Sequence, residues 1–148
     1  MINETPSSCV LMREKTTPPV PGTPGVSRVF FTGEDIGSSH LSTGLTRFEP
    51  GAGLFWHLHL VDESVTLLEG QATLEIGGVD QPINSYQLQP LDTSFIPART
   101  PHRFYNSGAG PMRILWSYPT GRIVRYRVNP DGSLPNDLAP GEPKLPAE

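Results

Sequence analysis

Short strand-like runs, each bounded by glycine or proline, are the feature that most constrains the fold of this chain. The runs are rich in β-branched, leucine and aromatic residues. They cover residues 26–31, 41–48, 53–60, 65–69, 72–76, 86–88, 93–96, 102–105, 112–118 and 123–128. No stretch has the apolar spacing of an amphipathic helix of several turns. The pattern predicts an all-β domain, either a sandwich or a barrel.

Proline marks the two ends of this domain. Of the 17 prolines in the 148 residues, five precede Val26 and five follow Val128. Because proline fixes φ and removes a backbone donor, such segments favour extended, irregular structure. We therefore predict a proline-rich arm over residues 1–25, one barrel over residues 26–128, and a proline-rich tail over residues 129–148. A chain of this length is sufficient for one buried core.

The charge balance and the single cysteine exclude several classes of protein. With 11 basic and 15 acidic residues the net charge is −4, and no basic block offers a footprint for nucleic acid. Cys9 is alone, so no internal disulfide framework is expected. The start lacks the pattern of a signal peptide, and no run of about 18 apolar residues occurs. The expectation is a cytoplasmic protein without a nucleic-acid or membrane partner.

Three of the four histidines lie in two short segments with metal-ligand spacing. His57 and His59 are two residues apart, so on a strand their side chains share one face at a separation of about 7 Å. Glu63 follows after a short bend that would return the next strand beside the imidazoles. His102, in the second segment, is the candidate third histidine, and the four together would hold one metal ion. His40 lies outside both segments.

The His-Leu-His pair alone also fits an exposed or hydrogen-bonded pair of histidines. Its context favours ligation, because both segments resemble the two signature motifs of the cupin family. The first motif, G(X)5HXH(X)3-4E(X)6G, is matched in full by Gly51, His57, His59, Glu63 and Gly70. The resemblance covers roughly residues 47–118. It implies a double-stranded β-helix, the jelly-roll barrel of cupins, with the metal inside.

The second motif, G(X)5PXG(X)2H(X)3N, is matched only in part. Pro97, His102 and Asn106 stand at its positions, but Leu91 and Arg99 replace its two glycines. The replacements affect backbone freedom and leave the ligand atoms untouched. Arg99 would therefore need a turn that tolerates a side chain.

The predicted ligand set limits the metal without identifying it. Three imidazoles and one carboxylate suit a divalent transition ion, namely Fe, Mn, Co, Ni, Zn or Cu. If the ion is six-coordinate, two neighbouring positions remain for water, substrate or dioxygen, as in a catalytic site. No general acid or base is placed by spacing.

Strand alternation suggests which side chains line the cavity. Phe55 shares a face with the first two histidines, and Phe104 shares a face with His102. Trp116 on a late strand is a further candidate, although all three aromatic residues also fit ordinary barrel core. Arg47, on the strand that leads into the first motif, is a candidate partner for a substrate carboxylate. The other arginine candidates are Arg99, Arg103, Arg122, Arg125 and Arg127.

These features predict a metal-dependent enzyme acting on a small oxygenated molecule, such as a hydroxy or keto acid, a sugar derivative or a phenolic compound. The family resemblance leaves dioxygenase, isomerase and lyase reactions open. The alternatives are a non-catalytic module in which the metal organises a ligand pocket, and a purely structural or storage barrel. The resemblance and the proline-rich arms also suggest a homodimer.

Overall fold

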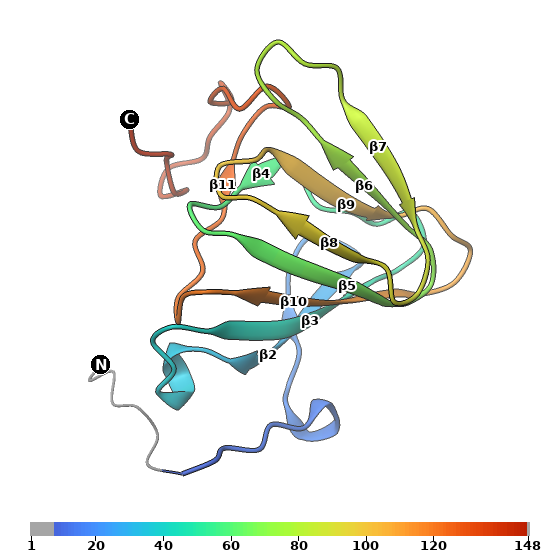
Figure 1. The fold of residues 1–148 in the computed structure, drawn as a ribbon, viewed down its shortest axis with the longest axis vertical. Helices are drawn as coiled ribbons and strands as arrows, with labels where there is room; N and C mark the ends of the chain where they lie inside the picture. The colour runs from blue at the N-terminus through green and yellow to red at the C-terminus, as the bar shows by residue number, and fades with distance from the viewer. Residues whose placement is uncertain (1–7, 148) are drawn as a thin grey trace.

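The computed structural model describes residues 8–147, which form two facing antiparallel sheets (Figure 1). The first sheet has the order β1-β2-β3-β10-β5-β8, and the second has the order β11-β4-β9-β6-β7. Strands of the first sheet are β1 (Val20–Pro21), β2 (Val26–Thr32), β3 (Ser42–Phe48), β5 (Glu63–Glu69), β8 (Thr93–Ile96) and β10 (Met112–Tyr118). Strands of the second are β4 (His57–Leu58), β6 (Ala72–Ile76), β7 (Asn84–Leu88), β9 (His102–Asn106) and β11 (Tyr126–Arg127).

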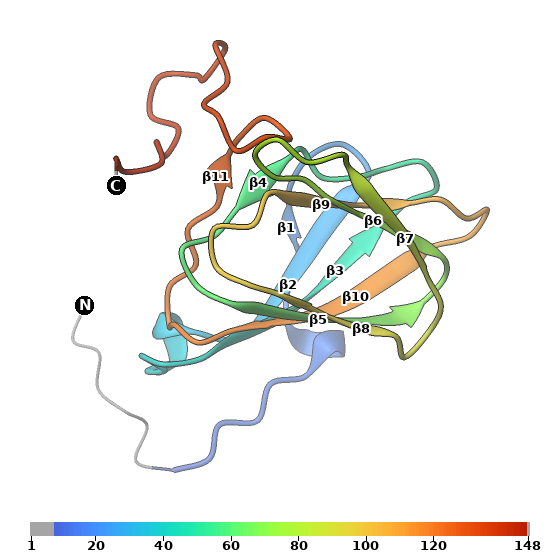
Figure 2. The same cartoon turned by 45° about the horizontal axis from the view of Figure 1, so that its top comes forward.

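The chain passes repeatedly from one sheet to the other, which is the winding of a jelly roll. β3 and β5 lie in the first sheet while β4 and β6 lie in the second, and β8, β9 and β10 alternate in the same way. Figure 2 shows β9, β6 and β7 crossing over β5, β8 and β10 with the core between them. The predicted all-β jelly-roll barrel is confirmed.

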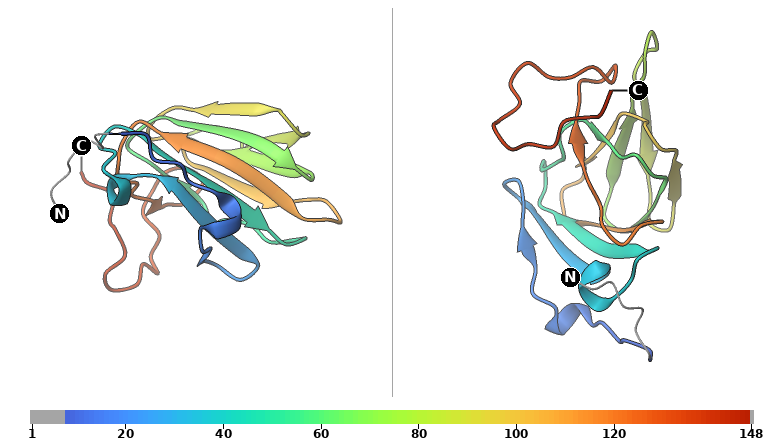
Figure 3. Two further views of the ribbon diagram at one scale, coloured as in Figure 1. Left: turned by 90° about the horizontal axis from the view of Figure 1, so that it is seen from below. Right: turned by 90° about the vertical axis from the view of Figure 1, so that its left-hand side faces the viewer.

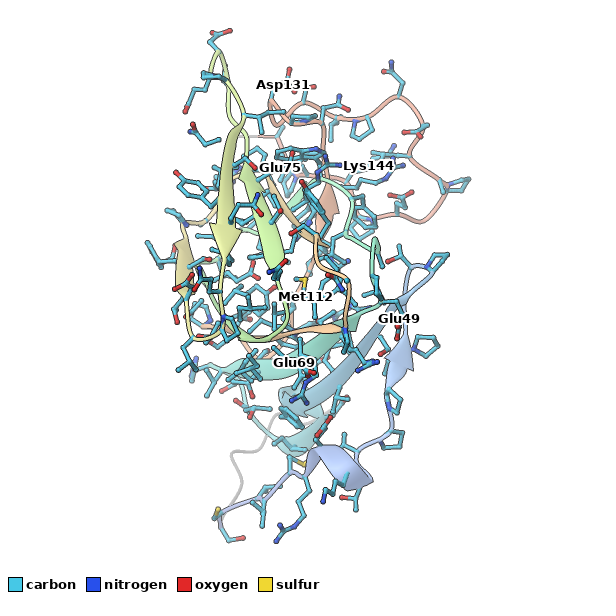
Figure 4. All side chains as sticks on the ribbon, turned by 90° about the vertical axis from the view of Figure 1, so that its right-hand side faces the viewer. Glu49, Glu69, Glu75, Met112, Asp131 and Lys144 are labelled. Atoms are coloured by element: carbon cyan, nitrogen blue, oxygen red, sulfur yellow. The ribbon has the colours of Figure 1, made fainter. Side chains whose placement is uncertain are left out.

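Side chains from both inner faces fill the space between the sheets (Figure 4). On β10 every second residue, from Met112 through Ile114 and Trp116 to Tyr118, is buried. Met112 is fully buried between the sheets, where Figure 4 labels it. This period of two places one row of each strand in the core and the other on the outer surface.

The predicted strands over 72–76, 93–96 and 112–118 agree with the structure, but two others are shorter than predicted. The run 53–60 pairs only at His57–Leu58, with a single bridge from Gly53 to Tyr105. His59 lies beyond the strand, where its carbonyl accepts a hydrogen bond from the Arg99 backbone N–H at 2.7 Å. The run 123–128 pairs only at Tyr126–Arg127, because residues before it leave the sheet to cover the barrel interior.

Leu91 and Arg99 adopt the backbone conformation that the missing glycines would favour. Their φ angles are 77° and 65°, in the left-handed region. A side chain in this region crowds the following carbonyl oxygen and costs about 1–2 kcal/mol. The turn at Arg99 therefore tolerates a side chain, as the sequence requires.

In the right-hand view of Figure 3 the segment after β11 lies at the top of the molecule and the segment before β2 lies at the bottom. Before β2 the chain forms a single turn, η1 (Glu14–Thr16), and the short strand β1; a second turn, η2 (Glu34–Ile36), follows β2. After β11 the segment folds back on the barrel, and Arg127 pairs with Asp137 and Glu142 at 2.9–3.1 Å. Within residues 8–147, no helix has the length and apolarity needed to span a membrane.

Candidate metal centre

The four predicted ligands meet where the two sheets converge. His57 lies on β4 and pairs directly with His102, the first residue of β9. Glu63 is the first residue of β5 in the other sheet, and His59 follows β4 in the connecting turn. All four side chains are buried, with exposed fractions between 1% and 5%. The structure thus brings together residues that the sequence separates by 45 positions.

The distances between the ligand atoms fit one ion. One ligand atom from each residue lies within 4.8 Å of all the others. Glu63 Oε2 is 3.1 Å from His102 Nε2 and 3.5 Å from His59 Nε2. Two ligands bound at right angles to one ion, each at about 2.1 Å, are roughly 3 Å apart. The spacing is therefore that of neighbouring ligands around one ion.

The backbone fixes how each imidazole is presented. Each Nδ1 lies 2.8–2.9 Å from a backbone carbonyl oxygen. The pairs are His57 with Phe55, His59 with Val124, and His102 with Thr100. Because a carbonyl only accepts, Nδ1 must carry the proton in every pair. Each ring is thereby turned so that its Nε2 faces the common centre, which is the orientation that metal-bound histidines adopt.

Burial also sets the charge of these groups. Desolvation lowers the pKa of His57 well below its ordinary value, and the nearby His102 and Arg125 lower it further. Desolvation likewise lowers the pKa of His59, partly opposed by the Glu63 carboxylate. Burial, the largest single cause, would raise the pKa of Glu63, but the hydrogen bond and charge of His102, the charge of His59 and a hydrogen bond from Tyr118 together lower it. Neutral imidazoles and an ionised carboxylate are the forms that bind a divalent transition ion.

A cavity of about 120 Å³ opens over this centre. Phe104 and Trp116, two predicted substrate contacts, are part of its wall. Phe55 does not line it; its side chain is 38% exposed and its ring packs edge-on against His57. Arg47 does not line it either, because its side chain lies on the outer face and pairs with Glu49 at 3.3 Å. The cavity wall therefore includes two of the four predicted substrate residues.

Trp116 is held in the wall by its own contacts. Its Nε1–H donates to Thr46 Oγ1 at 2.9 Å, and its ring lies edge-on to Phe30. Gly44 on the neighbouring strand makes room for it, since a Cβ atom at that position would be 2.2 Å from the indole ring. The indole plane is thereby fixed at the cavity edge.

Other polar side chains of the wall include Tyr118, Arg28 and Arg125, and of these the sequence offered only Arg125, as one of six candidate arginines. The Tyr118 hydroxyl lies 3.2 Å from His59 Nε2, and burial followed by the charge of Glu63 raises the pKa of Tyr118 well above its ordinary value. Arg28 and Arg125 also line the cavity. Alternation along β10 from Trp116 would have indicated Tyr118. Alternation over 123–128 predicted a regular strand there, whereas Arg125 precedes β11 and lies in the cavity wall.

Asn106 closes the second motif without reaching the cavity. Its buried amide donates to the carbonyls of Phe48 at 3.1 Å and Gly110 at 2.8 Å, and its Oδ1 accepts from the Gly108 N–H at 2.9 Å. It therefore ties the end of β9 to the next turn and to β3.

Comparison with known proteins agrees with this geometry. Residues 44–118 match the cupin domain. The chain belongs to the cupin family. No curated protein sequence gives a significant match to this cupin. Its four-residue cluster is thus the part of a cupin barrel that can hold one divalent transition ion.

Solved structures similar to this cupin share its fold at low identity. An oxalate decarboxylase mutant from Bacillus subtilis matches with a TM-score of 0.68 and 20% identity, covering 74% of this chain and 29% of that chain. A formate complex of oxalate decarboxylase from Lactobacillus farciminis matches with a TM-score of 0.68 and 16% identity, covering 76% of this chain and 34% of that chain. A recombinant oxalate oxidase in complex with glycolate matches with a TM-score of 0.65 and 17% identity, covering 72% of this chain and 56% of that chain. This cupin therefore spans about a third of the length of the decarboxylases.

Proposed function

We propose that this cupin is a metal-dependent enzyme that acts on a small hydroxy or keto acid. The observation that carries the proposal is the buried set of three histidines and one glutamate at the base of a cavity of about 120 Å³. Backbone carbonyls hold the three rings so that each Nε2 faces the centre. The ligand set is therefore already oriented to bind an ion. A divalent ion bound there would polarise a carbonyl or lower the pKa of a bound hydroxyl.

The residues of the wall favour some reactions over others. The raised pKa of Tyr118 keeps its hydroxyl protonated, so it can donate a hydrogen bond to a substrate oxygen. Among the described lining residues, Glu63 is the only carboxylate, and His57 and His59, both predicted ligands, are the only imidazoles. With these groups committed to the ion, no side chain of suitable pKa is left to abstract a proton. The wall therefore favours a lyase or a dioxygenase reaction over an isomerase.

The small size of the cavity and the two arginines in its wall support an acid as the substrate instead of a sugar derivative or a phenolic compound. The structural neighbours named above include decarboxylases and an oxidase of a small acid, which supports the same substrate class for this chain.

Turnover by the metal-loaded protein tests the proposal. Purified protein loaded separately with Mn, Fe, Co, Ni, Cu or Zn is incubated with hydroxy and keto acids, with and without dioxygen, and substrate loss is followed by NMR. We expect metal-dependent loss of one acid, abolished in His102→Ala and retained in His40→Ala, whose histidine is exposed and distant from the cluster in sequence. Loss that requires dioxygen indicates a dioxygenase, and loss without it indicates a lyase. Tight binding of an acid with no loss of any compound would instead support the non-catalytic module.

A further inference from the structure

Two arginines reach the cavity from segments far apart in the sequence. Arg28 lies on β2, where Val26, Arg28 and Phe30 alternate with outward-facing residues; Val26 packs in the core, and Arg28 and Phe30 line the cavity. Arg125 precedes β11, next to Val124, whose carbonyl orients His59. The peptide that positions a metal ligand thus also brings a cation to the cavity.

No carboxylate pairs with these two guanidiniums in the described chain, a property that they share with the exposed Arg13 and Arg122 outside this cavity. Four other arginines each contact at least one acid at 2.7–3.4 Å. The pairs are Arg47 with Glu49, Arg103 with Glu75, Arg113 with Glu69 and Glu14, and Arg127 with Asp137 and Glu142. Within residues 8–147, Arg28 and Arg125 form no such ion pair.

Each of the two arginines instead stacks on an aromatic ring. The Arg28 guanidinium carbon lies 5.4 Å from the Phe30 ring centroid, and that of Arg125 lies 5.5 Å from the Phe55 centroid. A cation–π contact of this kind helps to hold the guanidinium and, unlike an ion pair, does not occupy its N–H groups, which stay available for bidentate pairing with a carboxylate. Phe55, which does not line the cavity, acts through Arg125 in this arrangement.

The cavity therefore has an excess of positive charge. Its described lining contains one carboxylate, Glu63, and two guanidiniums, and a divalent ion would add two more positive charges. Desolvation and then the charge of Arg28 lower the pKa of Arg125, as expected for two cations held near each other without an intervening acid. A partly desolvated cation without a partner is costly, and an anionic ligand offsets that cost.

We propose that Arg28 and Arg125 form a carboxylate subsite opposite the metal centre, and that the substrate is a small dicarboxylic acid with one carboxylate at each place. The inference rests on the proposed function and specifies its substrate. Both arginines lie outside residues 44–118, which match the cupin domain, so the subsite belongs to the flanks of this chain. The dicarboxylic acid satisfies both groups of positive charge at once, whereas a monocarboxylic acid leaves one group unpaired.

Calorimetric titration with malonate, and with propionate as the matched acid that lacks the second carboxylate, tests the subsite. The titrations use metal-free and Mn-loaded protein, each as wild type, Arg28→Gln, Arg125→Gln and Arg47→Gln. Arg47 lies on the outer face of the same sheet, so its variant is a matched control. We expect each cavity variant to weaken malonate binding by roughly tenfold to a hundredfold, the effect of losing a charge-assisted hydrogen bond. Arg47→Gln should leave it unchanged.

Three further readouts separate the outcomes. Metal content should be the same in all four proteins, and propionate binding to the Mn-loaded protein should change less than malonate binding. Arg28→Lys and Arg125→Lys keep the charge and lose the bidentate edge, so they should give intermediate affinities and also identify a Gln variant that has merely misfolded. Malonate affinities in the cavity variants equal to that of Arg47→Gln, or no malonate binding by any form, would overturn the subsite. Arginine-dependent malonate binding by a protein that takes up no metal would contradict only the proposed function.

Discussion

The two sides of the cavity are built from the chain in different ways. On one side, His57, His59, Glu63 and His102 all lie within the stretch that matches the cupin domain, and three of them fall within seven consecutive residues. On the other side, Arg28 and Arg125 come from the first long strand and from the segment before the last one. The metal side depends on local spacing, whereas the substrate side depends on which distant segments the barrel brings together.

This difference separates residues inside the stretch that matches the cupin domain from residues outside it. Backbone carbonyls restrain all three imidazoles of the metal side, so its geometry follows from the barrel itself. Arg28 and Arg125 are held by aromatic rings. Substitutions on the substrate side can therefore change substrate selection without changing the ligand geometry.

Removal of one ligand gives the largest expected effect on the metal side. His102→Ala should lower the affinity for the metal by at least about 100-fold, because loss of even a supporting residue costs 10–100-fold. Elemental analysis after dialysis measures the retained metal, and circular dichroism checks that the variant is folded. His40→Ala should retain as much metal as the wild type. Equal metal content in the two variants would show that the four residues do not act as one site.

The motif asparagine tests whether the metal side also contains purely structural members. Asn106→Ala removes three hydrogen bonds and leaves the carbonyls of Phe48 and Gly110 without that partner. We expect the free energy of unfolding to fall by about 2–4 kcal/mol, because each buried group left unsatisfied costs about 1–3 kcal/mol. Urea denaturation measures the change. Asn84→Ala, at an exposed position of β7, should change it by less than about 0.5 kcal/mol.

The sequence predicts the metal ligands better than the arginines on the other side of the cavity. The ligands were predicted because a period of two and a short bend place His57, His59 and Glu63 together by local geometry. Phe104 and Trp116 were predicted as cavity residues because strand alternation has a range of only a few residues. Arg28 was missed because its approach to the cavity depends on the pairing of β2 with β3. Arg125 was only one of six candidate arginines, because the chain leaves the sheet before β11 and no local pattern shows that departure.

The pH dependence of the metal-free protein tests the electrostatics of the metal side. Burial lowers the pKa of His57 and of His59 in the folded protein, so below about pH 6.5 the unfolded chain binds more protons. Stability should therefore be full above this value and decrease as the pH falls below it. Between pH 7 and pH 5.5 we expect a loss of about 1–2 kcal/mol, measured by urea denaturation.

A matched variant separates this effect from general acid sensitivity. His57→Gln removes one of the two titrating groups, so the decrease in the free energy of unfolding over the same interval should be smaller than in the wild type. His40→Gln should leave the decrease unchanged, since His40 is exposed. An equal decrease in all three proteins would exclude the buried imidazoles as its cause.

Substitutions at the two non-glycine turns give the smallest expected effect, and they should raise the free energy of unfolding instead of lowering it. Leu91 is 77% exposed and has a φ of 77°, so its side chain contributes little packing while its backbone is strained. Leu91→Gly should relieve about 1–2 kcal/mol of strain and cost about 0.5–1 kcal/mol of chain entropy, so the free energy of unfolding should rise by about 0.5–1 kcal/mol. Leu91→Ala, which keeps a Cβ atom, should give no such gain. A stabilising Ala variant, or a destabilising Gly variant, would show that the Leu91 side chain itself holds the turn.

At Arg99, whose φ is 65°, the same change should gain less because that side chain makes an interaction of its own. The replacement of the motif glycines thus lowers stability at turns while the ligand atoms of the metal centre keep their places.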